Sequence, residues 1–255
     1  MPAPTRVHPA VPPEQDDAFR HLPGLRERVK PAHASELRVT PEVMAAWDER
    51  ARSLGRAADW RLSDQQLEAA HRALLCGADT ECELWIFSYG SLMWDPGFHF
   101  DEVRLADLPG HQRRFLFRTT LGRGSPETPG LMLSLEPGPG TCRGLVFRIP
   151  AETRHAESTC LWRREMIRGS YNPALLPVGT PQGGVRALVF AANHAHADHV
   201  GELPLEETAA LIAKASGFLG SNRHYLEQLA SQLHSLGIED EYVTQLLQQV
   251  QRVSG

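Results

Sequence analysis

The sequence predicts an α+β fold, in which a run of short strands is followed by a run of helices. Between residues 83 and 192, short apolar or alternating segments are bounded by Gly and Pro, as is typical of β-strands. After residue 204, apolar residues recur every three or four positions, which is the helical period. Because strands and helices are segregated along the chain, we expect a sheet or small barrel with helices around it and no wound parallel sheet.

Length, composition and charge favour a protein with its own apolar core and no polyanionic partner. The chain has 255 residues, 42% of them hydrophobic, which is enough to build a core. Its net charge of -5 gives no basic footprint for nucleic acid or for an acidic membrane surface. Its four cysteines form no Cys-x-x-Cys pair. The first residues lack the apolar core of a signal peptide and no apolar run is long enough to cross a bilayer, so we expect neither element. We expect a cytoplasmic monomer or weak homodimer with no nucleic-acid or membrane partner.

The N-terminal part of the chain divides into an arm and a helical extension. Residues 1–38 are rich in proline and charge, a composition that predicts a disordered arm. Residues 39–82 form the extension. Thr40 and Pro41 predict the start of a helix that continues to about Leu54. Ser63 and Gln66 form a capping box for a second helix ending near Gly77.

Residues 83–255 contain the remaining predicted elements, and we expect them to form one domain. The predicted strands are Leu84–Tyr89, Arg114–Thr119, Gly130–Leu135, Cys142–Ile149 and Val185–Ala192. A helix, Thr153–Arg168, lies between the last two strands, and a proline-containing loop through Pro173, Pro177 and Pro181 follows it. The C-terminal helices are Glu206–Ser216, Ser221–Leu236 and Glu239–Val253.

Glu165 is the first candidate for catalysis, because it is a carboxylate within an apolar stripe. On a helix it shares a face with Leu161, Trp162 and Met166. Partial burial raises the pKa of a carboxyl group toward neutrality, where proton transfer is most efficient. The alternative is an ion pair at the helix surface with a neighbouring arginine, namely Arg163, Arg164 or Arg168.

A second candidate site is the turn Tyr89-Gly90-Ser91, where an apolar strand ends abruptly. We expect Gly90 to adopt a positive φ angle that exposes consecutive N–H groups to a small ligand. Tyr89 and Ser91 add hydroxyl groups at its rim. The alternative is an ordinary turn after a strand. The loop from Gly122 to Gly130 also has turn chemistry, and its Arg123 would meet a substrate carboxylate if it lay beside a cleft.

The segment from His194 to His199 suggests a different chemistry. His194, His196, Asp198 and His199 have the spacing of the metal-binding motif of metallo-β-lactamase-type hydrolases. Such a set holds zinc and activates water. The motif lies late in the chain, however, and His224 and His234 are the only histidines after it. A solvated histidine-rich loop is therefore the preferred interpretation, and a zinc hydrolase is the alternative.

Five segments, in this order, resemble the ChaC family of γ-glutamylcyclotransferases. They are Trp85-Ile86-Phe87-Ser88-Tyr89-Gly90-Ser91-Leu92-Met93-Trp94, Gly124-Ser125-Pro126-Glu127-Thr128-Pro129-Gly130-Leu131-Met132-Leu133, Cys142-Arg143-Gly144-Leu145-Val146-Phe147-Arg148-Ile149-Pro150, Leu161-Trp162-Arg163-Arg164-Glu165-Met166 with Gly169-Ser170-Tyr171, and Gly220-Ser221-Asn222-Arg223-His224-Tyr225-Leu226. Ser88 stands where many relatives have Gly. The histidine cluster is not typical of the family.

The resemblance implies a small mixed β-barrel flanked by helices and a lyase that cleaves glutathione. Cyclisation of the γ-glutamyl group gives 5-oxoproline and cysteinylglycine, with no cofactor or metal. By resemblance, Glu165 is the catalytic acid. The resemblance also implies that the turn Tyr89, Gly90, Ser91 and Leu92 binds the γ-glutamyl part of the substrate. We further expect Phe87 and Ser88 to bind substrate, and Tyr171 and Tyr225 to donate hydroxyl groups at the pocket rim. A non-catalytic regulator that binds a γ-glutamyl ligand is a further alternative.

Overall fold

The centre of the molecule is a curled five-stranded sheet with the strand order β2-β3-β1-β5-β4. The computed structural model describes residues 18–75 and 82–254. The strands are β1 (Leu84–Ser88), β2 (Glu102–Thr119), β3 (Gly130–Ile149), β4 (Tyr171–Val178) and β5 (Val185–Ala192). β1 is antiparallel to β3 and parallel to β5, and β4 is antiparallel to β5. Because β3 also pairs with β5 at Leu135 and Ala191, the sheet curls into a half-barrel. This confirms the predicted α+β fold, with a curled sheet flanked by helices.

Two long strands form much of this sheet. The predicted strands Gly130–Leu135 and Cys142–Ile149 are the two ends of β3, and Arg114–Thr119 is the second half of β2. The two strands pair antiparallel along their length, with register shifts at Pro109/His111 and Phe115/Phe117. The segment predicted as a proline-containing loop is largely β4. This strand lies at the edge of the sheet, where proline is tolerated because no neighbouring strand needs its N–H group.

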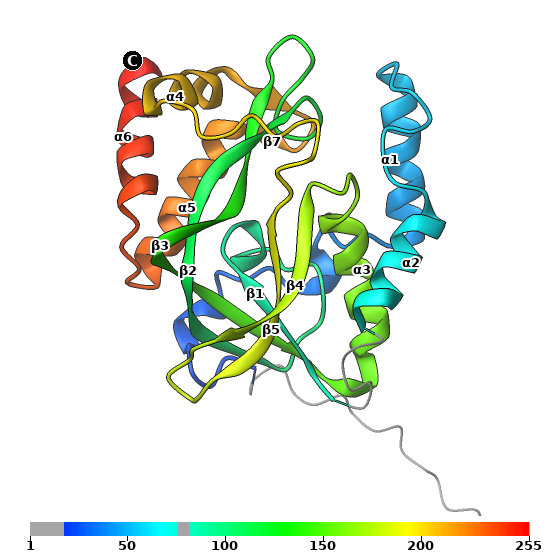
Figure 1. Ribbon diagram of the computed structural model, residues 1–255, viewed down its shortest axis with the longest axis vertical. Coiled ribbons are helices and arrows are strands. Elements are labelled where there is room, and N and C mark those ends of the chain that lie inside the picture. Colours follow the sequence, from blue (N-terminus) through cyan, green and yellow to red (C-terminus); the bar gives the residue numbers. More distant parts are fainter. Residues whose placement is uncertain (1–17, 76–81, 255) are drawn as a thin grey trace, which may run out of the picture.

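The predicted helices are present, and they pack on opposite sides of the half-barrel. On one side are α1 (Pro41–Ser53), α2 (Asp64–Leu75) and α3 (Arg154–Glu165), and on the other are α4 (Leu205–Lys214), α5 (Asn222–Ser235) and α6 (Glu241–Ser254) (Figure 1). Thr40 caps α1 by accepting the Val43 N–H, and the Ser63 backbone N–H donates to the Gln66 side chain at 2.9 Å. No helix in the described part of the chain is long and apolar enough to cross a bilayer.

One apolar core joins the sheet to the helices. Its largest fully buried side chains are aromatic, namely Trp162, Phe87, Phe98, Phe115, Phe147 and Phe190. Trp162 of α3 packs against Phe190 of β5, with ring centroids 6.1 Å apart. This contact fixes α3 on the sheet, and therefore the position of the residue that ends α3, Glu165.

Residues 18–38 are packed against the rest of the molecule, so the expectation of a disordered arm is wrong for them. Phe19, Leu25 and Val29 are buried in the core, and their spacing gives this segment an apolar face despite its prolines. The Lys30 N–H donates to the Trp94 carbonyl at 2.8 Å, and the Val103 N–H donates to the Ala18 carbonyl at 3.0 Å. Residues 1–17, the rest of the predicted arm, lie outside the described residues.

Candidate active site

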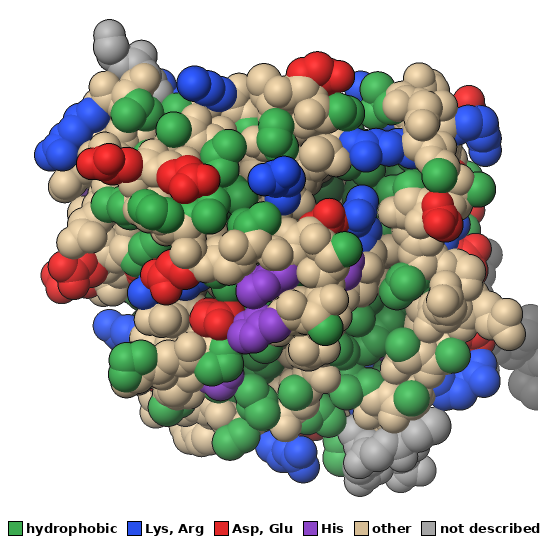
Figure 2. Space-filling view, turned by 45° about the horizontal axis from the view of Figure 1, so that its top comes forward, with side chains coloured by type: hydrophobic (Ala, Val, Ile, Leu, Met, Phe, Trp, Pro, Cys, Tyr) green, Lys and Arg blue, Asp and Glu red, His purple; other side chains and the backbone are tan. Residues whose placement is uncertain are grey.

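A cavity of about 230 Å³ opens between α1, the end of α3, the start of α5 and the loop after β2. Figure 2 shows a face of the molecule on which hydrophobic side chains line a hollow and positively charged side chains lie at its edge. Four of the predicted site residues line the cavity together: Ser91, Glu165, Tyr171 and Tyr225. They come from four separate segments of the chain.

Glu165 is the last residue of α3, and its side chain is 15% exposed. Burial raises the pKa of its carboxyl group, while Arg164, whose Nε lies 3.1 Å from Glu165 Oε1, acts in the opposite direction. The carboxylate is thus enclosed and also paired, with an arginine that is itself buried, and its catalytic role stays a prediction. The result is a carboxyl group able to exchange a proton nearer to neutrality than an exposed glutamate does.

Arg164 connects this carboxylate to the turn after β1. Its side chain is only 7% exposed. One guanidinium nitrogen donates to Ser91 Oγ at 2.9 Å, and another donates to the Asp95 carbonyl at 2.6 Å. The sequence did not distinguish it from Arg163 and Arg168, because position along a helix does not reveal which arginine meets a distant turn. Arg168 instead pairs with Asp198 at 2.7 Å.

Three tyrosines gather around Glu165. Burial raises the pKa of Tyr89 and Tyr171 well above the usual range and that of Tyr225 to about 12, and the charge of Glu165 contributes in every case. The phenols therefore remain protonated at neutral pH and are able to donate hydrogen bonds. Tyr171 and Tyr225 line the cavity, whereas Tyr89 lies beneath it and donates to the Phe190 carbonyl at 2.8 Å.

The turn after β1 differs from the expected cradle. Gly90 has φ -135° and ψ -134°, so the prediction of a positive φ angle is wrong. Glycine is required there for another reason, since a Cβ atom would lie 2.9 Å from Tyr225 Oη and 3.3 Å from Leu133 Cδ2. Tyr225 Oη accepts the Ser91 N–H. The glycine thus allows the phenol of α5 to reach the backbone of the turn.

Several predicted binding residues do not line the cavity. Phe87 and Ser88 are fully buried, and Leu92 is 7% exposed. The reason is the place of β1, which lies between β3 and β5 in the sheet and is covered along its length. Among Phe87 to Leu92, the cavity wall includes Ser91 alone. The other residues of the segment support the turn from below.

The histidine cluster makes contacts within the protein that leave no set of metal ligands. His196 Nε2 lies 2.9 Å from the Arg168 carbonyl, and its Nδ1 accepts the Asp198 N–H at 3.1 Å. His194 lies 3.0 Å from Glu136 and stacks on His199, with ring centroids 4.8 Å apart. Within residues 18–75 and 82–254, no three His, Cys, Asp or Glu side chains are arranged to hold a metal ion. The arrangement of side chains therefore does not favour the zinc hydrolase.

Other parts of the cavity wall were not anticipated from the sequence. Leu37 precedes the N-terminal extension, the extension contributes Trp47, Arg50 and Trp60, and the hairpin between α4 and α5 contributes Phe218 and Leu219. Trp47 and Phe218 meet edge to face with ring centroids 6.4 Å apart, and the Arg50 guanidinium lies 5.3 Å from the Phe218 ring centroid. Their sequence signals were weak, because aromatic residues at helical spacing usually belong to a core.

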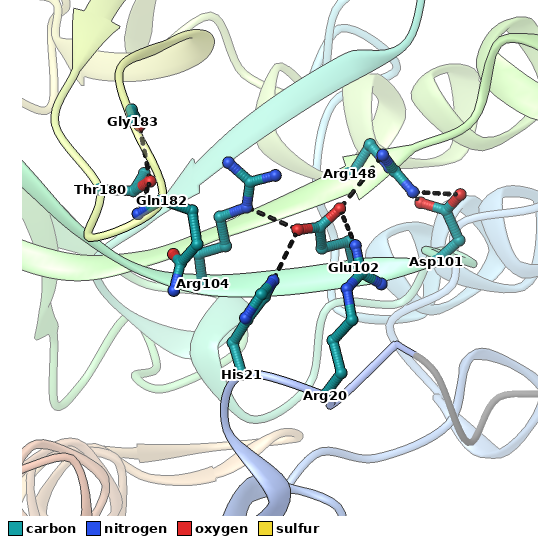
Figure 3. Close-up of polar contacts among 9 residues, drawn as sticks. All are labelled: Arg20, His21, Asp101, Glu102, Arg104, Arg148, Thr180, Gln182 and Gly183. Carbon is teal, nitrogen blue, oxygen red and sulfur yellow. Dashed lines mark hydrogen bonds and ion pairs between the residues drawn. The ribbon is translucent and has the colours of Figure 1, made fainter.

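A second polar cluster surrounds Glu102, and none of its members lines the cavity. Glu102 is fully buried at the start of β2 and pairs with Arg20, His21, Arg104 and Arg148 (Figure 3). Burial acts to raise the pKa of Glu102, but the hydrogen bond from Arg104 and the nearby positive charges outweigh it and lower the pKa. Because both oxygens of the Glu102 carboxylate are paired, this cluster attaches residues 20 and 21 to the sheet.

The fold and this cavity can be compared with known proteins. A family model described as ChaC-like protein matches residues 84–253. A glutathione-specific γ-glutamylcyclotransferase of Escherichia coli K12 is 40% identical over 192 residues, 75% of this chain and 83% of that protein. A glutathione-specific γ-glutamylcyclotransferase 1 of Homo sapiens is 31% identical over 173 residues, 66% of this chain and 78% of that protein.

Solved structures give the same picture of the fold. The crystal structure of a γ-glutamylcyclotransferase specific to glutathione from yeast has a TM-score of 0.62 at 25% identity, covering 67% of this chain and 96% of that chain. A second crystal structure of the yeast protein has a TM-score of 0.61. The residues that the family model matches, 84–253, span the half-barrel, α3 and the C-terminal helices.

Proposed function

This chain belongs to the ChaC family, and on that premise we propose that it cleaves glutathione by cyclising the γ-glutamyl group, releasing 5-oxoproline and cysteinylglycine. One observation carries the proposal. Glu165, a largely buried carboxylate with a raised pKa, shares a single cavity with Ser91, Tyr171 and Tyr225. The names of the curated relatives support glutathione as the substrate.

The proposed reaction needs one proton to move twice. Glu165 accepts a proton from the α-ammonium group of the γ-glutamyl unit, and the free amine attacks the γ-carbonyl carbon to form a five-membered ring. Attack leaves the ring nitrogen with a surplus proton, which passes to solvent. The tetrahedral oxyanion then collapses with cleavage of the amide C–N bond. Glu165 then returns the proton to the departing nitrogen of cysteinylglycine. A carboxyl group with a pKa raised toward neutrality suits both transfers.

The surrounding groups hold the substrate and stabilise charge. Ring closure is intramolecular, so holding the γ-glutamyl group folded on itself lowers the barrier by several kcal/mol, within the roughly 7–11 kcal/mol available from orientation. The phenols of Tyr171 and Tyr225 line the cavity with Glu165 and are the donors available to the oxyanion. Arg164 holds Glu165 and Ser91 together, so the base and the turn keep their relative positions.

The test is the substitution Glu165→Gln. It preserves shape but removes the proton acceptor, so we expect kcat for 5-oxoproline release from glutathione to fall by roughly 10²- to 10⁴-fold. Glutathione binding, measured by calorimetry, is expected to persist. Glu152→Gln, an exposed acid just before α3, is the control and should retain full activity. Near-normal 5-oxoproline release by the Glu165 variant would remove Glu165 from the mechanism. Binding without turnover by the unsubstituted protein would favour the non-catalytic regulator.

We also propose that the protein works in the reducing environment of the cytoplasm. Cys142 and Cys160 are free thiols, and burial raises the pKa of both. Thiols of this kind are poorly reactive and persist where disulfides do not form.

A further inference from the structure

The cavity contains a half-buried arginine that no carboxylate neutralises. Arg123 lines the wall, and no ion pair of its side chain occurs in the described ranges 18–75 and 82–254. Its contacts are a long hydrogen bond of 3.4 Å from Nη1 to the Ser221 carbonyl and the Tyr225 ring, whose centroid lies 5.7 Å from the guanidinium carbon. Arg164 and Arg168, which line the same cavity, are paired with Glu165 and Asp198. Arg123 therefore retains a bidentate donor surface for an incoming anion.

The backbone that carries Arg123 is held rigidly by the glycines on either side. The Leu219 N–H donates to the Gly122 carbonyl at 2.9 Å, and Gly122 has φ +85°. A Cβ atom on Gly124 would clash with the backbone of Thr119 and Gly130, and one on Gly217 would clash with the carbonyls of Gly122 and Gly124. The loop and the hairpin between α4 and α5 are thus in direct backbone contact. An arginine on such a fixed loop is preorganised for a ligand.

The Tyr225 ring shows where Arg123 lies relative to the proposed catalytic residue, Glu165. The charge of Glu165 raises the pKa of this tyrosine, and the charge of Arg123 lowers it, so the ring lies near both groups. The charge of Arg164 in turn lowers the pKa of Glu165, so these two groups also lie close together. The scissile nitrogen must lie beside Glu165, and the terminal carboxylate of cysteinylglycine lies two residues further along, about 7 Å in an extended peptide. This distance from the scissile nitrogen to the carboxylate is comparable to the length of a tyrosine side chain. A group on the far side of Tyr225 from Glu165 is therefore at the right distance to bind that carboxylate.

We propose that Arg123 binds the C-terminal carboxylate of the departing peptide, and that the site thereby selects γ-glutamyl peptides over γ-glutamylamines. The inference rests on the proposed function for the identity of the ligand. Burial lowers the pKa of Arg123, as occurs for a cation withdrawn from water without an anionic partner. A bound carboxylate restores the missing charge partner. The cavity as a whole suits a dianionic ligand, because its arginines outnumber its acids; they are Arg50, Arg118, Arg123, Arg164 and Arg168 against Glu165 and Asp198.

The experiment compares glutathione with its C-terminal amide, which lacks only the carboxylate. Binding is measured by calorimetry in the Glu165→Gln background, so that neither ligand is consumed, and again with Arg123→Met or Arg123→Lys added. With Arg123 present, we expect glutathione to bind roughly ten- to hundred-fold more tightly than the amide, the effect of a charge-assisted hydrogen bond. Arg123→Met should abolish that preference by weakening glutathione alone, and Arg123→Lys should restore part of it. Arg186→Met, at an exposed arginine on β5, is the matched control and should keep the preference.

The outcomes separate this inference from the proposed function. If Arg123→Met weakens glutathione and its amide equally, or weakens neither, the assignment of Arg123 is wrong. A thermal melt of each variant identifies a failure to fold, in which case the Arg123→Lys variant gives the same comparison. If the unsubstituted protein binds glutathione with this preference but releases no 5-oxoproline, the proposed function fails while the role of Arg123 stands. If glutathione does not bind at all, both are overturned.

Discussion

At the scale of single residues, the site depends on close approach as much as on reactive groups. Gly90 lets the Tyr225 phenol reach the backbone of the turn, and a Cβ atom there would lie 2.9 Å from Tyr225 Oη. Real Cβ atoms almost never make contacts that short, so any side chain displaces the phenol or the turn. The same phenol accepts the Ser91 N–H. Gly90 is therefore a structural requirement of the cavity, although it carries no functional group.

This requirement predicts the effect of Gly90→Val. The branched side chain would overpack the contact with Tyr225 and Leu133, which costs about 1–3 kcal/mol of stability. Displacement of Ser91 and Tyr225 should raise KM for glutathione by about tenfold or more, since a misplaced site loses orientation. Steady-state 5-oxoproline release and a urea melt measure the two effects. Gly24→Val is the control, because a Cβ atom at Gly24 would meet nothing within 4 Å. An unchanged KM in Gly90→Val would show that the turn does not touch substrate.

At the scale of elements, the sequence predicted the helices and strands that have a recognisable pattern within their own residues. The capping residues Thr40 and Ser63 and the periodic apolar faces located the helices, and apolar runs located the buried strands. The strand β4 was not predicted, because its prolines indicate a loop unless the strand is known to lie at the edge of a sheet. Residues 18–38 were predicted to be disordered because composition outweighed their sparse apolar residues. The sequence predicted the catalytic candidate Glu165 and the binding candidates Ser91, Tyr171 and Tyr225, which share one cavity. It did not predict the role of Arg164, because that role depends on which distant elements meet in the fold.

The contact between α2 and α3 predicts a dependence of stability on pH. His71 of α2 is 4% exposed, lies 2.9 Å from Ser158 Oγ and packs against the Trp162 ring. Burial, together with the nearby charges of His155, Arg154 and Arg163, lowers the pKa of His71 to about 4. The folded protein thus keeps this imidazole neutral, whereas the unfolded chain binds a proton below a pH of about 6.5. Stability is therefore complete above pH 6.5 and falls as the pH decreases from about 6.5 to 4.

His71→Gln tests this linkage. The loss over that range should be about 3 kcal/mol for His71 alone, and a glutamine removes the titration while keeping an amide near Ser158. The free energy of urea unfolding at pH 7.5 and pH 4.5 should thus differ by a smaller amount in the variant than in the unsubstituted protein. His33→Gln, at an exposed histidine, should leave that difference unchanged. An equal pH dependence in the two variants would mean that His71 is protonated in the fold.

At the scale of the whole molecule, the N-terminal segment connects parts of the fold that the sheet does not. Residues 18–38 pass along the half-barrel and are attached to it by charge at both ends. Arg20 and His21 pair with Glu102 of β2, and Arg38 forms a bidentate pair with Glu157 of α3. Between them, the Lys30 side chain pairs with Asp95, whose carbonyl accepts from Arg164. Through Asp95, the segment contacts the residue that helps to hold Arg164, the partner of Glu165. At its C-terminal end, the segment forms part of the cavity wall at Leu37 and leads into α1.

Glu102→Gln tests how strongly this segment is attached. The substitution leaves three arginines and His21 around a buried neutral amide, and removing one partner of a buried ion pair typically costs about 3–5 kcal/mol. Because the arginines are partly exposed and can turn toward water, we expect the lower end of that range in the free energy of urea unfolding. Limited proteolysis should then cut within residues 18–38 more rapidly. Asp107→Asn removes the acid of an exposed pair with Arg143, where side-chain exposures are 54% and 48%, and should cost less than about 1 kcal/mol. Equal losses in the two variants would mean that Glu102 contributes no more than a surface ion pair, and that the apolar contacts of Phe19, Leu25 and Val29 alone hold the segment in place.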